Sequence, residues 1–352
     1  MAWTTPFYDR PRVNQAGNAL LTDGLDEEIR AVELAVVNNW RTAHGFPLQC
    51  IKMTLLKRAK RIDPTATIAQ RLKRLPSIVA KLTREPTMKL SQMQDLGGCR
   101  AVVSKIGHVD RLVKRYQRAR SKNPRSRHEQ TTAKDYISSP KIDGYRGIHL
   151  IYKYRSNAKN RSIYNDQKIE IQIRSRLQHA WATAVEIVDA FTNQNLKSGL
   201  KLKLGDANWR RFFALMGSAI AIRERRPIVS GTPTDPNELK RELKGLAKSL
   251  NIVTVLSGLN IALEKGMKAP GAASYLLKLD IEQRRVSWTP YTKAELVKAS
   301  EDYLKVETET KDNPQILAVL VSVESIKALR TAYPNYYLDA NQFIEAFRMA
   351  IT

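Results

Sequence analysis

The segment Lys168–Arg174, with the sequence KIEIQIR, alternates polar and apolar residues without a break. Successive side chains of a β-strand point to opposite faces, so this pattern predicts a strand with three isoleucines against a core. Its other face carries Lys168, Glu170, Gln172 and Arg174, which suits either an ordinary solvent-exposed surface or the floor of a binding site. A half-buried strand needs partner strands, so we expect the chain to contain a sheet.

The remaining pattern predicts an α+β protein, with a mixed β-sheet flanked by helices. We expect further strands at residues 101–104 and 148–154, and helices at 25–42, 48–62, 109–120, 177–190 and 209–223. Residues 65–82 are expected to contain a helix that begins at Pro76. After a Pro-rich linker at 226–238, we expect helices at 239–263, 293–306, 325–331 and 341–351, a hairpin of strands at 274–281 and 286–292, and a strand at 315–323.

Composition excludes several classes of protein. The chain has 352 residues, 43% apolar and 26% charged, which excludes wholesale disorder. Two cysteines, Cys50 and Cys99, cannot form a disulfide framework. The N-terminal residues lack the pattern of a signal peptide, and every apolar stretch falls short of the roughly 20 residues that span a bilayer. We expect a soluble, cytoplasmic monomer without membrane contacts.

Basic charge is concentrated in one part of the chain. Residues 51–180 hold 31 basic and 9 acidic side chains, a net charge of +22, whereas the whole chain carries +25. Surfaces usually mix the two signs, so this block predicts contact with a polyanion, although a solvated basic surface is the alternative.

Two further motifs lie in the basic block. The first, DLGGCR at Asp95–Arg100, has a carboxylate before two glycines; it could hold a metal near a phosphate, or Asp95 could simply cap a turn. The second, Lys134–His149, gathers cations around Tyr136 and Tyr145, as a nucleotide site requires.

Four segments in this order resemble the synthetase domain of the RelA/SpoT family: RLKRLPSIVAKL, DLGGCRAVV, KDYISSPKIDGYRGIHLIY and IEIQIRSRLQHAWATAVE. Members of that family transfer pyrophosphate from ATP to a ribose 3′-hydroxyl. The resemblance covers about residues 25–195 and implies a nucleotidyltransferase-like synthetase domain that uses ATP and Mg²⁺.

The resemblance also implies roles for individual residues. Asp95 and Glu170 match the catalytic acids. Asp95 is expected to bind Mg²⁺, and Glu170 is expected either to help hold the metal or to take the proton from the attacking hydroxyl. The expected ATP-binding residues are Lys73, Ser77 and Lys81 at the phosphates and Arg100 at the adenine. Tyr145 is expected to stack on the acceptor base. The other expected acceptor contacts are Lys141, Arg146, His149 and Gln172.

Departures from the family pattern bear on the acceptor. Asp143 stands where many members have Asn, and Gly147 stands where Ser or Thr is common. No adjacent His-Asp pair occurs in the chain, so the hydrolase half of the long members is expected to be absent.

Three functions remain open at this point: a (p)ppGpp alarmone synthetase that uses GDP or GTP, an enzyme that pyrophosphorylates the 3′-CCA end of tRNA, and an inactive RNA-binding module. Both expected acids are present, which disfavours the third. The charge of the basic block exceeds what two nucleotides need, so we favour tRNA. The expected contacts with its backbone are Lys57, Arg58, Arg115 and Arg118.

The tail carries Tyr333 and Tyr336 in a YPNY sequence before the last helix. They could simply pack that helix, but the arrangement resembles the CapRel-type fused toxin–antitoxin proteins of phage defence. That resemblance implies a C-terminal pseudo-zinc-finger domain that inhibits the enzyme through these tyrosines until a phage structural protein, such as the major capsid protein, releases it. No Cys or His follows His179, so no zinc is expected. We therefore expect a toxic synthetase domain at 1–230, a helical linker at 231–270 and an antitoxin, phage-sensing domain at 271–352.

Overall fold

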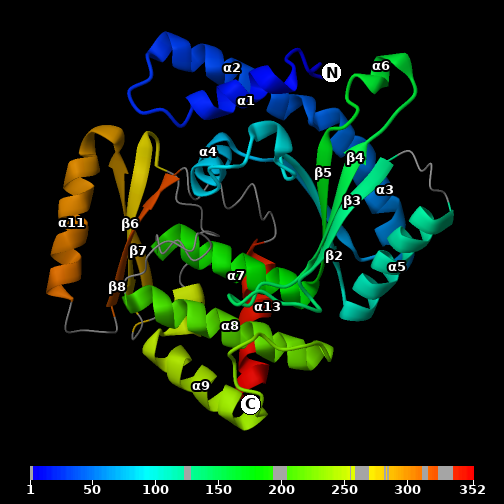
Figure 1. Cartoon of the computed structure of the whole chain (residues 1–352). Helices are drawn as coiled ribbons and strands as arrows, with labels where there is room; N and C mark the ends of the chain where they lie inside the picture. The colour runs from blue at the N-terminus through cyan, green and yellow to red at the C-terminus, as the bar shows by residue number, and fades with distance from the viewer. Residues whose placement is uncertain are drawn as a thin grey trace. The chain divides into compact units, whose positions relative to one another are not determined.

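The computed structural model describes residues 3–122, 128–192, 204–253, 255–257, 269–280, 283, 285–310, 316–323 and 336–352 (Figure 1). The chain divides into two compact units. The first, here called the sheet unit, consists of Met1–Tyr136 and Gly147–Ser175. The second, called the helical unit, consists of Ile137–Arg146 and Arg176–Thr352.

The sheet unit is built on five strands in the order β1-β2-β5-β4-β3. Their bounds are β1 Thr67–Leu72, β2 Gly97–Val103, β3 His128–Asp135, β4 Ile148–Tyr154 and β5 Lys168–Ser175. The pair β2–β5 is parallel, and the other three pairs are antiparallel. The expected mixed sheet is therefore confirmed. Burial alternates along β5 from Lys168 to Ile173 as the sequence predicts, but Arg174, expected on the open polar face, is buried.

Helices α3 (Gly45–Ile62) and α5 (Ile106–Lys122) pack on one face of this sheet (Figure 1). This is the face of the three isoleucines of β5, all at most 1% exposed. At Gly97, opposite Ile169, a Cβ would lie 2.7 Å from that side chain and 3.6 Å from Leu48 of α3. The polar side chains of β5 consequently lie on the face away from α3 and α5.

A second core of the sheet unit joins α1 (Arg10–Ala19), α2 (Glu27–Ala43), α4 (Leu75–Arg84) and the short 3₁₀ helix η1 (Leu90–Gln92). Asp9 and Asp26 cap α1 and α2 by accepting backbone N–H bonds. A four-residue helix, α6 (Lys159–Ser162), lies between β4 and β5.

The helical unit has an aromatic core between α7 (Arg176–Thr192), α8 (Leu204–Glu224), α9 (Pro236–Ser249) and α13 (Tyr336–Ile351). Phe212 and Phe343 are each 0% exposed, and their ring centroids lie 6.3 Å apart. Phe347 lies 5.7 Å from Phe212 by the same measure. The last helix thus shares its core with helices expected to belong to the synthetase domain.

A three-stranded antiparallel sheet, β7-β6-β8, completes the helical unit. Its strands are β6 Ala272–Asp280, β7 Arg285–Thr292 and β8 Ile316–Ser322. The 3₁₀ helix η2 (Lys293–Glu295) leads into α11 (Leu296–Glu309), which packs on β6 and β8. The expected hairpin, the following helix and the last strand are confirmed.

Other expectations need correction. Residues 65–82 divide into strand β1 and helix α4, with Pro76 in the first turn of α4. Helix α1 and strand β3 were not expected. The expected linker is packed rather than free, because Val229 is 0% exposed and its N–H donates to Ser218 Oγ at 2.9 Å.

The helix expected at 239–263 ends as α9 at Ser249, with a further helical turn around Val253; residues 258–263 lie outside the described residues. The helix expected at 325–331 lies outside them as well. Within the described part of the chain, no helix has the length and apolar character needed to cross a bilayer.

Candidate active site

Asp95 lies between two lysines at the entrance to β2. Its Oδ2 accepts from Lys73 Nζ at 2.9 Å, and its Oδ1 accepts from Lys81 Nζ at 3.1 Å. Lys73 directly follows β1 and its N–H donates to Leu96 O, so the antiparallel pairing of β1 with β2 fixes its position. Ser77 and Lys81 lie four residues apart on α4, and therefore on one helix face.

The lysines govern the charge of Asp95. Burial alone would raise the pKa of its carboxyl group, but Lys73 and Lys81 outweigh burial and hold the pKa below its usual value. Asp95 is therefore ionised at neutral pH. Two ammonium groups on one carboxylate also leave positive charge that a phosphate could take up.

Glu170 lies at the centre of a hydrogen-bonded row across β4 and β5. Its Oε1 meets His149 Nδ1 at 2.8 Å, and its Oε2 accepts from Gln172 Nε2 at 2.7 Å. Gln172 Oε1 in turn accepts from Arg174 Nη2 at 3.0 Å. Tyr136 places its ring edge-to-face with His149, at 5.2 Å between centroids.

The two acids affect each other electrostatically. Burial and the charge of Asp95 raise the pKa of Glu170, but they are outweighed by the hydrogen bond and charge of His149 together with the hydrogen bond from Gln172. The net pKa lies below the usual value, so Glu170 is also ionised at neutral pH. Parallel pairing of Gly98 with Glu170 brings Asp95, three residues before Gly98, to this part of the sheet.

Arg100 and Ser77 complete the expected ATP-binding set within the sheet unit. Arg100 pairs with Gln172 in the parallel ladder and with Ala69 across β1, so it stands one strand from the Glu170 row. Ser77 is exposed on the first turn of α4. The structure thus gathers Lys73, Lys81, Asp95, Glu170 and their neighbours in one unit, although their roles stay predictions.

The expected acceptor loop, Ile137–Arg146, belongs to the helical unit. Asp143 Oδ1 accepts from Tyr145 N at 2.8 Å, which closes a turn before the tyrosine. Gly144 has φ of +95°, and a Cβ built on it would lie 2.5 Å from Phe213 O of α8. Lys141 Nζ lies 5.3 Å from the centroid of the half-buried Tyr145 ring.

Arg146 holds this loop in place. It is 2% exposed, its Nη1 donates to Pro227 O at 2.9 Å, and its Nη2 donates to Ile137 O at 2.7 Å. A contact between Arg146 and an acceptor stays a prediction, and it would require these bonds to change. The sequence did not indicate this supporting role.

The expected nucleic-acid contacts lie on α3 and α5. Lys57, Arg115 and Arg118 are exposed, whereas Arg58 lies 4.3 Å over the ring of Tyr116. Both helices cover the isoleucine face of the sheet, so the expected nucleic-acid contacts lie on the side of the sheet opposite Glu170. Of the tail tyrosines, Tyr333 lies outside the described residues, and Tyr336 is described only as the first residue of α13.

A magnesium ion fits the two acids only together with a substrate. Within the described ranges, no group of three or more His, Cys, Asp or Glu side chains could hold a metal. Mg²⁺ is commonly bound by one or two carboxylates plus substrate phosphates, rather than by a cage of protein ligands. Asp95 and Glu170, both ionised and within electrostatic reach of each other, supply such a pair.

Arg174 and Tyr136 are supporting residues that were not included among the expected site residues. Arg174 is 5% exposed and orients Gln172, which orients Glu170. The alternation of β5 already placed Arg174 on the Glu170 face, so the signal for its role was present in the sequence.

Comparison with known proteins identifies the family. The region described as found in RelA / SpoT proteins matches residues 70–190. The GTP pyrophosphokinase YwaC of Bacillus subtilis is 31% identical over 153 residues, which cover 41% of this chain and 68% of YwaC. The GTP pyrophosphokinase YjbM of the same organism is 27% identical over 148 residues, covering 42% of this chain and 66% of YjbM. The chain therefore belongs to the RelA/SpoT family.

Among solved structures, small alarmone synthetase 2 from Bacillus subtilis aligns with 53% of this chain and 94% of its own, at 23% identity and a TM-score of 0.41. A likeness at that score adds nothing to the assignment, which rests on the sequence matches. The family match ends at residue 190, so a CapRel-type arrangement and a pseudo-zinc-finger domain in the tail stay predictions.

Proposed function

We propose that this protein transfers the pyrophosphoryl group of ATP to a ribose 3′-hydroxyl. The observation that carries the proposal is a pair of ionised acids. Asp95 lies beside two lysines just before β2, and Glu170 lies beside His149 and Gln172 on the neighbouring strand β5. The two curated relatives are named as GTP pyrophosphokinases, which supports the same chemistry.

The residues divide the work of the reaction. The ATP phosphates displace the Asp95 carboxylate from Lys73 and Lys81, and the two lysines then bind the phosphates. Glu170 accepts the proton of the 3′-hydroxyl, whose oxygen bonds to the β-phosphorus while the bond to the α-phosphate oxygen breaks and AMP leaves. Mg²⁺, held by Asp95 and Glu170 with the phosphates, would neutralise their charge. Positioning and charge stabilisation contribute most of the rate in this class of reaction.

As acceptor we propose the 3′-CCA end of tRNA, because a net charge of +22 over residues 51–180 suits a long phosphate backbone. The location of α3 and α5 means that such an RNA must also reach the face of the sheet opposite Glu170. A guanine nucleotide, giving an alarmone, is the second candidate, and it is favoured by the names of the two relatives. Either acceptor suits activity in the cytoplasm.

We further propose that the tail restrains the enzyme through Tyr333 and Tyr336, and that a phage structural protein such as a capsid protein releases it. Removal of the tail is a poor test, because α13 fills the aromatic core between α7 and α8. Replacement of the two tyrosines by alanine is a milder change, and it should raise transfer activity and growth arrest. Equal activity before and after replacement would contradict the restraint.

The deciding experiment uses the full-length protein with Tyr333→Ala and Tyr336→Ala, which removes the proposed restraint, as the background for all further replacements. It is incubated with Mg²⁺, γ-labelled ATP and either GDP, GTP or bulk tRNA. We expect label on tRNA, and no label on any acceptor with Glu170→Ala. Paired replacement Arg115→Glu and Arg118→Glu should weaken tRNA labelling, whereas Lys244→Gln with Lys248→Gln on the exposed face of α9 serves as control. Label on GDP or GTP alone would establish the alarmone alternative, and label on no acceptor would contradict the transferase proposal.

A further inference from the structure

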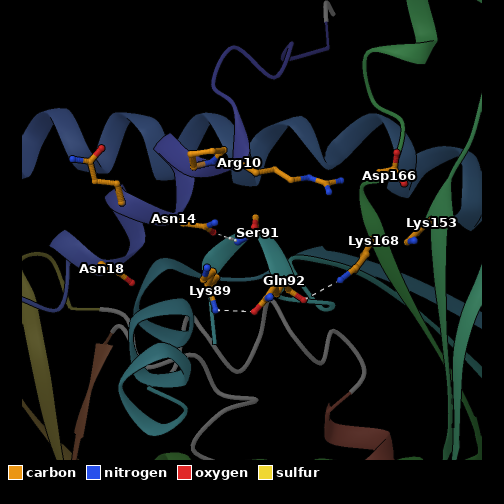
Figure 2. Close-up of a pocket in the computed structure, with 11 residues that line it drawn as sticks. Arg10, Asn14, Asn18, Lys89, Ser91, Gln92, Lys153, Asp166 and Lys168 are labelled. Atoms are coloured by element: carbon orange, nitrogen blue, oxygen red, sulfur yellow. Dashed lines mark hydrogen bonds between the residues drawn. The ribbon is translucent and has the colours of Figure 1, made fainter. Parts of the chain in front are cut away.

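A cavity of about 770 Å³ lies in the sheet unit, among α1, η1 and the adjoining ends of β4 and β5 (Figure 2). Its lining includes four cationic side chains, Arg10, Lys89, Lys153 and Lys168. None of them was predicted to bind ATP, the acceptor or a metal. The volume lies within the range of about 300–1,000 Å³ that is usual for small-ligand sites.

Three of the cations in this cavity lie close enough to repel one another electrostatically. Lys153 and Lys168 are direct cross-strand partners in the β4–β5 ladder, where like charges destabilise a sheet. The pKa of Lys168 is lowered first by burial and then by the charges of Lys153 and Arg10. Among the described residues, none of the four cations forms an ion pair.

The acid in the lining does not offset this charge. Asp166 is one of the eleven lining residues, and its Oδ2 already accepts from Arg155 Nη1 at 2.7 Å. Arg155 lies outside the lining, so the charge of Asp166 is balanced by a cation that does not belong to the cavity. The cavity therefore repels cations and attracts anions.

The polar side chains of the lining present donors. Asn14 Oδ1 accepts from Ser91 N at 3.0 Å, and Gln92 Oε1 accepts from Lys89 N at 3.2 Å (Figure 2). With their oxygens engaged, the amide NH₂ groups of Asn14 and Gln92 donate to no described residue. The lining contains no aromatic ring on which a base could stack.

We propose that this cavity binds a small anion carrying several phosphate groups, at a site separate from the two catalytic acids. Four cations and spare amide donors suit phosphate oxygens, which accept several hydrogen bonds each. The limited volume of the cavity suits a compact oligophosphate better than the extended backbone of an RNA. The proposal stands whether or not the chain transfers pyrophosphate, because it concerns residues outside the proposed reaction.

The test is calorimetric titration of the full chain with inorganic tripolyphosphate. A Lys73→Gln background weakens binding at the proposed ATP-phosphate site. In that background, Arg10→Gln with Lys89→Gln should weaken tripolyphosphate binding by about tenfold or more. Lys244→Gln with Lys248→Gln removes equal charge from the exposed face of α9 and should leave binding unchanged.

The same proteins are titrated with bulk tRNA to separate the two sources of phosphate. Loss of tripolyphosphate binding with tRNA binding retained supports the proposal. Unchanged tripolyphosphate binding in the Arg10→Gln, Lys89→Gln protein overturns it, as does a loss confined to tRNA. Should that double variant not fold, Lys89→Glu alone, at an exposed side chain, gives the same comparison.

Discussion

Asp95 and Glu170 are both buried enough to be destabilised as anions, yet they are kept ionised by different neighbours. Asp95 is held by two ammonium groups, Lys73 and Lys81, on flexible side chains. Glu170 is held within the sheet by His149 and Gln172, and Gln172 is fixed by Arg174. Lysine ammonium groups on long side chains can turn from Asp95 to an incoming phosphate, whereas a carboxylate on a strand is suited to a positioned proton transfer. The difference fits the proposed division of roles, in which the surroundings of Asp95 bind ATP and those of Glu170 serve the chemical step.

The largest expected effect comes from Glu170→Gln. It keeps the shape of the side chain and removes the proposed base, so we expect transfer to slow by about 10² to 10⁴-fold. ATP affinity should change little, which equilibrium binding of a non-hydrolysable ATP analogue measures. Glu129→Gln, at a carboxylate 52% exposed on β3, is the matched control. A normal rate in the Glu170→Gln protein would contradict the assignment of the chemical step.

Lys73→Gln should act on affinity instead. Loss of one charge-assisted contact with phosphate predicts ATP binding weaker by roughly 10- to 100-fold. The pKa of Asp95 should rise as well, because Lys73 lowers it. Lys105→Gln, exposed before α5, serves as control. A slower transfer rate with unchanged ATP binding would contradict the proposal that the surroundings of Asp95 bind ATP while those of Glu170 serve the chemical step.

A smaller effect is expected where the expected acceptor loop contacts α8. In Gly217→Ala, the new Cβ would lie 2.7 Å from Gly144 Cα, so the loop or α8 must shift. Overpacking of this kind costs about 1–3 kcal/mol of unfolding free energy, measured by denaturant titration. The acceptor KM should rise while ATP binding stays normal. Gly245→Ala on α9, where a Cβ meets no atom within 4 Å, should be neutral or slightly stabilising.

The smallest effect concerns the titration of Glu170. Its folded pKa lies below the usual value, so its ionised contacts stabilise the fold above its ordinary pKa and are lost as pH falls through the folded pKa. His149→Asn removes the neighbour that lowers the pKa most, so the midpoint should move to higher pH. Carboxyl ¹³C titration of the full chain measures this directly. An unmoved midpoint would show that His149 does not hold the charge.

The sequence predicted β5 and its polar face because strict alternation has no other simple interpretation. It did not predict α1, in which Val13, Ala16 and Gly17 are the buried residues, or β3, an edge strand with mostly exposed side chains. Asp95 and Glu170 could be predicted because each belongs to a motif that is contiguous along the chain. The cationic cavity could not be predicted from the sequence, because its lining comes from short pieces of α1, η1, β4 and β5 that no local pattern connects.

The contacts of the expected acceptor loop, residues 137–146, imply an order of folding during synthesis on the ribosome. Residues 137–146 leave the ribosome before α8 and Pro227, yet Gly144 rests on α8 and Arg146 donates to Pro227 O. Until those later residues emerge, a nascent chain can form the sheet but lacks the residues that position this loop. A fragment limited to residues 70–190, the region shared with the family, would lack α8 and Pro227 and therefore these contacts of the loop, and it would also lack α1, α2 and α3 of the sheet unit.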